Sequence, residues 1–361
     1  MTVRDYFSRD YAEARRKFRE AATRAGAALA TYVNPKVKGP DGEELSTDVA
    51  RLGPRDASRV LITVSATHGA EGFAGSGAQV GSFEVGLGRE LPADTALLAV
   101  HAINPYGFAW LRRVTEDNVD LNRNFVDHAG PRPLNPGYDE LADAICPSEL
   151  QEVALATAQR KLDAFGKKHG PAALQAAITA GQYNHADGVF YGGERPTWSR
   201  ETLLKIVTEH AARARRLAVI DYHTGLGPWG YGEPIVTHAP NTPGIARARQ
   251  WYGDRITSPA LGNSTSADVK GDILTGLEAR HRGIEFTCLA LEYGTLSLQQ
   301  VLDAVRADNW LHAHGDPKSA QGRDIKVMVR DAFYGDKDDW KGMIFEQAVA
   351  AERNALRGLA G

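Results

Sequence analysis

Two side chains that can bind a metal follow directly after a short apolar segment. His68 and Glu71 lie three residues apart in the sequence His-Gly-Ala-Glu, shortly after the apolar residues 60–64. A spacing of about one turn lets an imidazole nitrogen and a carboxylate oxygen converge on one point, and this pair of ligand types suits zinc. A polar surface turn would contain the same residues. A metal site therefore needs a further ligand from another part of the chain.

Two more apolar segments end in polar side chains of the same kinds. Residues 217–220 run into His223, and residues 284–291 run into Glu292. The carboxyl ends of neighbouring parallel strands meet at one edge of a sheet, where ligands bind in α/β proteins. Three of the four side chains would make an open zinc site with two histidines and one glutamate. The fourth would be a free carboxylate for the water at the metal.

The elements that must position these side chains predict an α/β fold. Four short apolar segments have the pattern of strands buried on both faces of a sheet, at residues 60–64, 95–100, 217–220 and 284–291. Helices are expected at residues 9–30, 78–85, 150–165, 171–180 and 198–213. The turn residues 39–42, between residues 31–37 and 45–52, indicate a β-hairpin. We expect a central mixed, mostly parallel sheet flanked by helices.

The domain organisation follows from the absence of a dividing segment. No internal repeat, low-complexity tract or linker divides the 361 residues, so we expect a single domain spanning residues 1–361. Residues 126–200 interrupt the α/β pattern with helical segments and an irregular loop. Such an insertion often forms a lid or the wall of a pocket.

Composition excludes several classes of partner. With 43% hydrophobic and 24% charged residues and a net charge of −3, the chain has no basic surface suited to nucleic acid or to an anionic membrane. No segment has the length and hydrophobicity of a membrane span, and the first ten residues are too charged for a signal peptide. We therefore expect a cytoplasmic protein. The two cysteines, Cys146 and Cys288, indicate no disulfide framework. The oligomeric state stays open.

A polar segment at residues 110–125 is rich in arginine and asparagine, including Arg112, Arg113, Asn122 and Arg123. Planar guanidinium groups and amides suit carboxylates, so this segment is a candidate substrate-binding loop. The alternative is a solvated, charged loop. Loops on a rigid scaffold often carry binding residues, which keeps both interpretations open at this point.

Five motifs, taken in chain order, resemble those of the zinc carboxypeptidase superfamily. They are His68-Gly-Ala-Glu71, Asn104-Pro-Tyr-Gly107, Arg113 with Asp120-Leu-Asn-Arg-Asn-Phe125, Asp221-Tyr-His223 and Leu291-Glu-Tyr-Gly-Thr295. Their order and residue types match both the carboxypeptidase A branch and the aspartoacylase and succinylglutamate desuccinylase branch. With Gly181-Gln-Tyr183 and Tyr191-Gly-Gly193, the chain resembles an uncharacterised family within this superfamily. The resemblance covers residues 59–295.

The resemblance implies a zinc carboxypeptidase-like fold with one zinc ion per chain. His68, Glu71 and His223 would hold the zinc, and Glu292 would be the general base and acid. Asp120 would orient His68 from behind, as metal-bound histidines usually require.

The resemblance also implies a site for a substrate carboxylate. Asn122 and Arg123 match the residues that hold it, and Arg113, or its neighbour Arg112, matches the arginine that polarises the scissile carbonyl. The spacing from Arg113 to Asn122 is nearer to that of the acylase branch. Residues 253–290 contain no tyrosine, whereas the carboxypeptidase A branch has a substrate-capping tyrosine some twenty residues before the catalytic glutamate.

We therefore predict a zinc-dependent hydrolase that cleaves an amide bond, with an N-acyl amino acid or a similar small carboxylate-bearing molecule as substrate. The alternative is a metallocarboxypeptidase that removes C-terminal residues from peptides. A serine hydrolase using Ser76 is disfavoured because Ala74 occupies the first glycine position of a nucleophile elbow. A zinc-bearing binding module without turnover would not need Glu292. Asp221 is interpreted as a turn residue, and the structural or surface histidines are His101, His128, His185 and His238.

Overall fold

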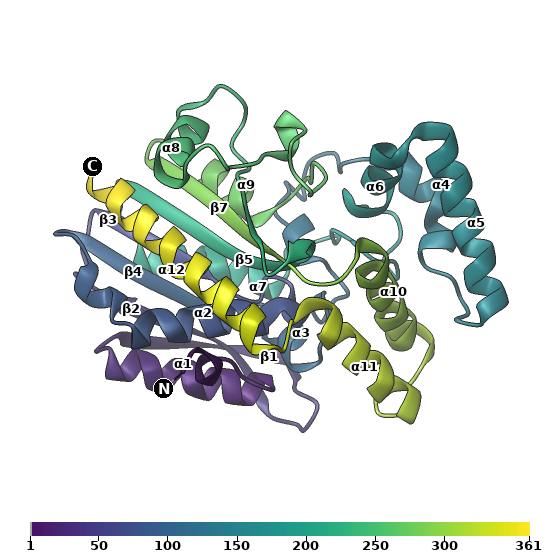
Figure 1. The fold of residues 1–361 in the computed structure, drawn as a ribbon, viewed down its shortest axis with the longest axis horizontal. Coiled ribbons are helices and arrows are strands. Elements are labelled where there is room, and N and C mark those ends of the chain that lie inside the picture. Colours follow the sequence, from purple (N-terminus) through teal and green to yellow (C-terminus); the bar gives the residue numbers. More distant parts are fainter. Residues whose placement is uncertain (1) are drawn as a thin grey trace.

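The computed structural model describes residues 2–361, and its centre is a seven-stranded sheet (Figure 1). The strand order is β1-β2-β4-β3-β5-β7-β6. The strands are β1 (Ala28–Lys38), β2 (Glu44–Leu52), β3 (Arg59–Val64), β4 (Thr95–His101), β5 (Arg216–Trp229), β6 (Gly232–Ile235) and β7 (Glu285–Gly294).

The centre of the sheet is parallel and its edges are antiparallel. Strands β4, β3, β5 and β7 pair in parallel, while β1 and β2 at one edge and β6 at the other pair antiparallel. The predicted α/β fold with a mixed, mostly parallel sheet is therefore confirmed. The four apolar segments recognised in the sequence are these four central strands, because only strands buried on both faces read as continuous apolar runs.

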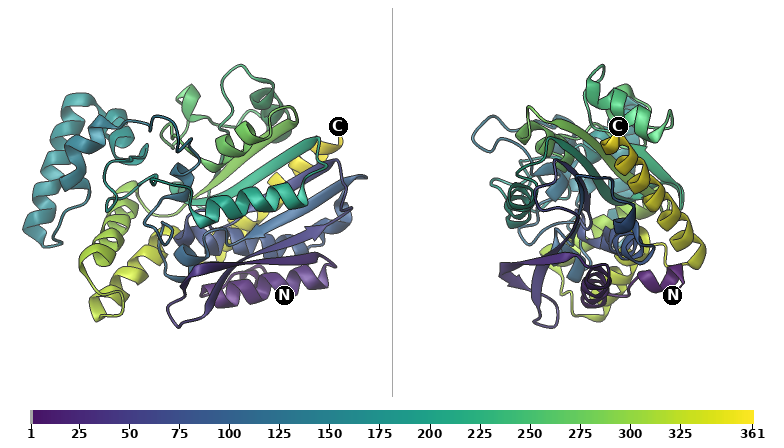
Figure 2. Two further views of the ribbon diagram at one scale, coloured as in Figure 1. Left: turned by 180° about the vertical axis from the view of Figure 1, so that it is seen from behind. Right: turned by 90° about the vertical axis from the view of Figure 1, so that its left-hand side faces the viewer.

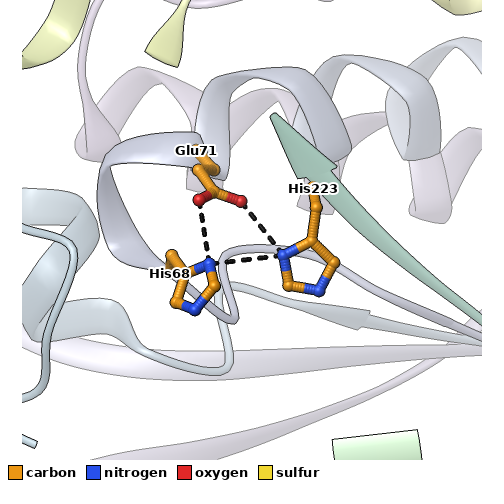
Figure 3. Close-up of side chains that lie close together, drawn as sticks. All are labelled: His68, Glu71 and His223. Atoms are coloured by element: carbon orange, nitrogen blue, oxygen red, sulfur yellow. Dashed lines mark hydrogen bonds and ion pairs between the residues drawn. The ribbon is translucent and has the colours of Figure 1, made fainter. Parts of the chain in front are cut away.

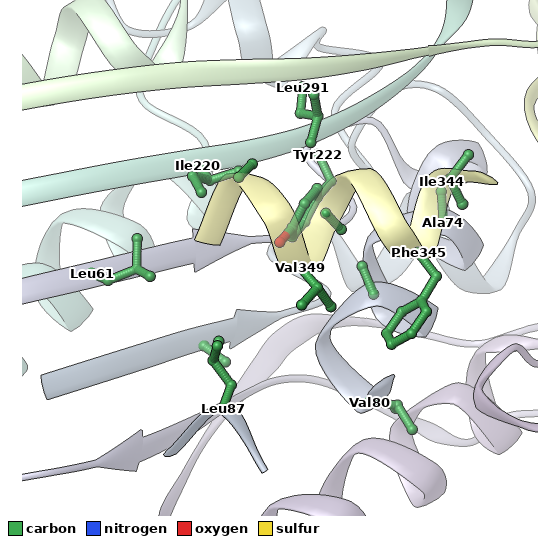
Figure 4. Close-up of a cluster of buried hydrophobic side chains, with 14 of the residues drawn as sticks. Leu61, Ala74, Val80, Leu87, Ile220, Tyr222, Leu291, Ile344, Phe345 and Val349 are labelled. Atoms are coloured by element: carbon green, nitrogen blue, oxygen red, sulfur yellow. The ribbon is translucent and has the colours of Figure 1, made fainter. Parts of the chain in front are cut away.

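Helices cover both faces of the sheet (Figures 1 and 2). The helices are α1 (Tyr11–Arg24), α2 (Gly72–Glu84), α3 (Pro105–Ala109), α4 (Pro136–Ile145), α5 (Glu152–His169), α6 (Pro171–Thr179), α7 (Trp198–His210), α8 (Pro243–Tyr252), α9 (Ile273–Arg280), α10 (Leu298–His314), α11 (Ala320–Phe333) and α12 (Asp338–Ala360). Apolar side chains of α1, α2, α8 and α12 share one buried cluster with the sheet, part of which Figure 4 shows. Those of α7 and α9 share the cluster on the other face.

The first helix is shorter than the sequence pattern predicts. The expected helix at residues 9–30 ends at Arg24, and residues 28–30 already belong to β1. Gly26 has a φ of 78°, the left-handed conformation that ends helices and that glycine adopts without steric cost. The helical spacing of Leu29 was therefore misleading. The predicted hairpin is confirmed, since β1 and β2 pair antiparallel around the turn.

The segment 126–200 holds α4, α5 and α6 beside the sheet rather than on it (Figure 1). Apolar side chains of these helices form a cluster of their own with α10 and α11, including Tyr138, Ile178, Val305 and Phe333. That residues 1–361 form one domain with this insertion stays a prediction. Among residues 2–361, no helix is both long and apolar enough to cross a membrane.

Candidate metal centre and active site

Three potential metal ligands converge at the carboxyl end of the central strands (Figure 3). His68 follows β3, Glu71 ends the short 3₁₀ helix Gly69–Glu71, and His223 lies within β5. The His68 Nδ1 atom is 2.8 Å from Glu71 Oε1 and 3.3 Å from His223 Nδ1. The His223 Nδ1 atom is 3.1 Å from Glu71 Oε2, and all three side chains are buried. Two imidazole nitrogens and one carboxylate thus face one point.

The glycine after His68 allows this loop to pack tightly. A Cβ atom at Gly69 would lie 1.9 Å from the carbonyl carbon of Gly107, which is closer than any side chain permits. The Gly69 N–H donates to the carbonyl of Arg113, and the Ala70 N–H donates to the carbonyl of Arg112. The metal-ligand loop and the arginine segment are therefore held together by their backbones.

A carboxylate stands behind each histidine. The Nε2 atom of His68 is 3.1 Å from Asp120 Oδ1, and the Nε2 atom of His223 is 2.7 Å from Asp221 Oδ2. Each carboxylate holds its imidazole ring so that Nδ1 faces Glu71. Such pairs fix ring orientation and tautomer at metal sites.

Asp221 is a residue whose role the sequence analysis missed. It is not in a turn but within β5, where side chains two residues apart lie on the same face, so its carboxylate reaches the ring of His223. Its second oxygen, Oδ1, accepts a hydrogen bond from Thr67 at 2.7 Å. The available signal was the spacing Asp-x-His directly after the predicted strand at residues 217–220, which β5 extends past His223.

Charges around the cluster favour metal binding. Burial alone would raise the pKa of Glu71, but the charge of His68 and hydrogen bonds from both histidines hold this pKa well below its usual range. For Asp120 as well, burial is outweighed by Arg113, Arg123 and His68, so its pKa is lowered well below the ordinary value. Both carboxylates are therefore ionised at neutral pH. The donor set of two imidazoles and one carboxylate, opening on a cavity, fits an open zinc site.

Glu292 lies beside this cluster on the neighbouring strand. In the parallel pair β5–β7 it is the register partner of His223, and its side chain lines the same cavity. Its Oε1 atom accepts a hydrogen bond from the Leu226 N–H at 3.0 Å. Burial and the nearby charge of Glu71 raise the pKa of Glu292 to about 8.

The two neighbouring arginines point in different directions. Arg113 lines the cavity, donates to Asp120 at 3.0 Å and lies 3.4 Å from Glu71. Arg112 does not line it, because its side chain is buried against Asp308, to which its Nε–H donates at 3.0 Å. Arg112 is therefore not among the residues that line this cavity, and Arg113 is the arginine next to the potential metal ligands.

Asn122 and Arg123 form another wall of the cavity. Asn122 Oδ1 accepts a hydrogen bond from the Ile273 N–H at the start of α9. Arg123 is 4% exposed and donates to the carbonyl groups of Asn122 and Thr179. Its buried Nε–H has no partner among residues 2–361. This N–H is itself buried near Gly181, so a ligand would meet Arg123 at the atoms that line the cavity.

Phe190, from the insertion, contacts both cavity arginines and was not recognised in the sequence. Its ring centroid is 5.1 Å from the guanidinium carbon of Arg113 and 5.7 Å from that of Arg123. Its φ of 57° is rare for an aromatic residue, and strained backbone of this kind persists only where surrounding contacts hold it. Gln175, Ile178 and Thr179 of the insertion also line the cavity. The insertion therefore forms part of the cavity wall.

The cavity has a volume of about 200 Å³. The potential metal ligands, Glu292, Arg113 and the pair Asn122 and Arg123 line it, whereas Arg112 and Asp120 do not.

Ser76, the nucleophile of the alternative serine-hydrolase hypothesis, lies outside this cavity. Ser76 Oγ is 2.9 Å from His101 Nε2, but the two residues are 1% and 0% exposed and neither lines the cavity. A nucleophile that no substrate reaches excludes the serine-hydrolase interpretation for this pair.

The chain is similar to several solved structures. Carboxypeptidase A from Helicoverpa armigera matches at 12% identity over 90% of this chain and 74% of that chain, with a TM-score of 0.48. Succinylglutamate desuccinylase from Chromobacterium violaceum matches at 14% identity over 88% and 73%, with a TM-score of 0.39. An aspartoacylase family protein from Mesorhizobium loti matches at 15% identity over 80% and 66%, with a TM-score of 0.36.

Among curated proteins, no match is found. Residues 7–347 match the model of the family DUF2817, which is described as a protein of unknown function, and this chain therefore belongs to that family.

Proposed function

We propose that the protein is a zinc-dependent hydrolase that cleaves the amide bond of a small, carboxylate-bearing substrate such as an N-acyl amino acid. The observation that supports this is that one cavity is lined by the three potential ligands together with Glu292, Arg113, Asn122 and Arg123. A metal site of structural type would be closed. This one opens on the cavity, as catalytic zinc sites do.

His68, Glu71 and His223 would hold one zinc ion, with Asp120 and Asp221 holding the two imidazole rings. When bound, zinc supplies Lewis-acid polarisation of the scissile carbonyl and lowers the pKa of a water molecule. The chain's own residues would perform the remaining steps.

The charge of a bound zinc ion would favour the ionised form of Glu292, and this carboxylate would take a proton from the attacking water and pass it to the leaving amine. The Leu226 N–H occupies Oε1, so Oε2 is the oxygen left for the proton. Because the carboxylate side chain is buried beside the ligands, it would act in a site from which most water is excluded.

Arg113 would donate to the carbonyl oxygen as negative charge develops there. Its Nε–H donates to Asp120, which fixes the guanidinium plane beside His68 before substrate arrives. Arg123 and Asn122, which both line the cavity, would hold the substrate carboxylate in a charge-assisted pair.

The test is a substrate screen with the zinc-loaded protein, comparing N-acyl amino acids with short peptides that have free C-termini. We expect faster hydrolysis of the N-acyl amino acids. Preferential release of C-terminal residues from peptides would instead establish the alternative, a metallocarboxypeptidase. No hydrolysis in either set, by a protein that binds zinc, would overturn the proposal.

A further inference from the structure

One wall of the cavity is a continuous apolar stripe along a helix. We define the α10 wall as the apolar side chains of α10 and the end of α11 that line the cavity: Leu298, Val301, Leu302, Val305 and Phe333. On α10 the spacing is i, i+3, i+4 and i+7, so these residues form one stripe along the helix. No polar side chain belongs to this stripe.

The α10 wall adjoins the metal ligands. The Thr224 N–H donates to Glu71 at 3.0 Å, and the Thr224 hydroxyl donates to the carbonyl of Phe333 at 2.6 Å. A Cβ atom at Gly225 would lie 3.1 Å from the ring of Phe333 and 3.6 Å from Val301. A group bound next to the ligands on this side therefore meets hydrocarbon.

The carboxylate-binding pair lies against a different helix. Asn122 accepts from the first turn of α9, which packs on the sheet before β7, whereas α10 begins beyond the carboxyl end of β7. Figure 1 shows α9 and α10 on different sides of the ends of β5 and β7. A substrate whose carboxylate meets Arg123 and whose amide lies at the ligands would extend its acyl part toward α10.

The cationic side chains of the cavity decide which acyl groups fit. Among the cavity-lining residues within 2–361, Arg113 and Arg123 are the only arginines or lysines. Arg113 donates a hydrogen bond to Asp120 beside the potential metal ligands, and Arg123 would hold the carboxylate of the amino acid. A second carboxylate, on the acyl group, would be buried against the α10 wall without a partner, which is costly.

We propose that the α10 wall binds the acyl part of the substrate and that this acyl group is an uncharged hydrocarbon chain of several carbons. Val301 and Val305 are 7% exposed and Leu298 is 49% exposed, so the stripe runs from the buried part of the cavity to solvent. A chain of increasing length would gain contact along it. This inference rests on the proposed amide hydrolase activity and adds the class of acyl group.

The experiment measures kcat/KM for one amino acid carrying acetyl, butanoyl, hexanoyl and succinyl groups. Butanoyl and succinyl have the same four carbons and differ only in the terminal carboxylate. We expect kcat/KM to rise with length by up to about fourfold per methylene. We expect butanoyl to exceed succinyl by on the order of a hundredfold, because the buried carboxylate would be unpaired.

A variant sharpens this test. Leu298→Arg adds a cation at a half-exposed position of the α10 wall, and should reduce the butanoyl to succinyl ratio at least tenfold. The matched control is Val327→Arg, which changes a 52% exposed residue of α11 outside the cavity and should leave the ratio unchanged. Thermal unfolding of both variants checks that they are folded.

The outcomes separate the inference from the proposed function. Hydrolysis of all four compounds with succinyl equal to or better than butanoyl would overturn the inference and leave the amide hydrolase standing. Hydrolysis of none would overturn the proposed function. In that case calorimetry with the hexanoyl compound and Glu292→Gln still tests the α10 wall, since tighter binding of hexanoyl than of acetyl supports it and equal binding contradicts it.

Discussion

Two polar clusters lie next to each other along the central strands, and only one of them is open to a ligand. His223 lines the cavity with His68 and Glu71, whereas the preceding residue, Tyr222, points to the opposite side and donates to Glu352 of α12 at 2.7 Å. The Glu352 side chain is buried and also accepts from Ser82 of α2. Each cluster places a buried glutamate next to hydrogen-bonding side chains, which are histidines at Glu71 and hydroxyl groups at Glu352.

The clusters differ in whether a ligand can reach them and in the direction in which the pKa of the glutamate is shifted. Burial raises the pKa of Glu352 to about 7, and its two hydroxyl donors lower it by less than burial raises it. The same effect keeps the sealed His101 neutral, because burial lowers its pKa to about 4. At the cavity, in contrast, the two histidines keep Glu71 ionised. Similar residue types thus form a ligand site on one side and part of the buried core on the other.

The largest expected effect is loss of the metal. His68→Ala and His223→Ala should each reduce zinc content from about one per chain to background, since an open site with three ligands does not survive loss of one. Elemental analysis of the purified variants measures this. Ser76→Ala, in the sealed region, is the control and should keep both zinc and activity. Wild-type zinc content in both histidine variants would refute the ligand assignment.

The next effect distinguishes the two buried glutamates directly. Glu292→Gln should keep zinc but lower kcat by roughly a hundredfold to ten-thousandfold, because an amide accepts no proton from water. The same substitution at Glu352 should leave kcat within about twofold of wild type. If Glu292→Gln keeps wild-type turnover, the base lies elsewhere.

A smaller effect concerns substrate charge. Arg123→Ala should lower kcat/KM for the free acid by about tenfold to a hundredfold, since charge-assisted hydrogen bonds contribute roughly 1.5 to 3 kcal/mol. For the amidated substrate the change should be slight. Steady-state kinetics on the two compounds test this. Equal losses on both would mean that Arg123 only supports the loop.

The insertion should act through Phe190. Phe190→Leu removes the ring that contacts both arginines and should raise KM for the free acid by roughly twofold to thirtyfold, at about 0.5 to 2 kcal/mol for a cation–π contact. The amidated substrate should be affected less. An unchanged KM for the acid, in a variant that is folded, would show that the ring does not position the arginines.

The buried cluster of Glu352, Tyr222 and Ser82 should affect stability instead of catalysis. The ordinary pKa of Glu352 is 4.5 and the folded value is about 7, so its contribution to stability is complete below pH 4.5 and is lost as pH rises through 7. The change amounts to roughly 3 kcal/mol. Glu352→Gln should abolish this part of the decline.

Urea unfolding of wild type and Glu352→Gln at pH 5 and pH 8 measures the difference. The variant should lose less free energy of unfolding between these two pH values than wild type does. An identical pH dependence in both proteins would indicate that Glu352 is ionised in the folded state.

Much of the fold was predictable because the central strands are buried on both faces. The apolar segments at residues 60–64, 95–100, 217–220 and 284–291 correspond to β3, β4, β5 and β7. The helix at residues 9–30 was overextended, because the spacing of small apolar residues continues past the glycine that ends the helix. Boundaries of this kind depend on backbone conformation rather than on hydrophobic period.

By itself, the sequence determined which polar side chains follow the apolar segments of the central strands, since residue type and apolar pattern are local properties. It therefore identified His68, Glu71, His223 and Glu292 as candidates for one site. Only the tertiary structure showed that Arg113 lines the cavity and Arg112 does not, because adjacent side chains diverge and the partner of Arg112, Asp308, lies almost two hundred residues away. The same holds for Phe190, whose ring reaches the arginines only because the insertion folds back on the cavity.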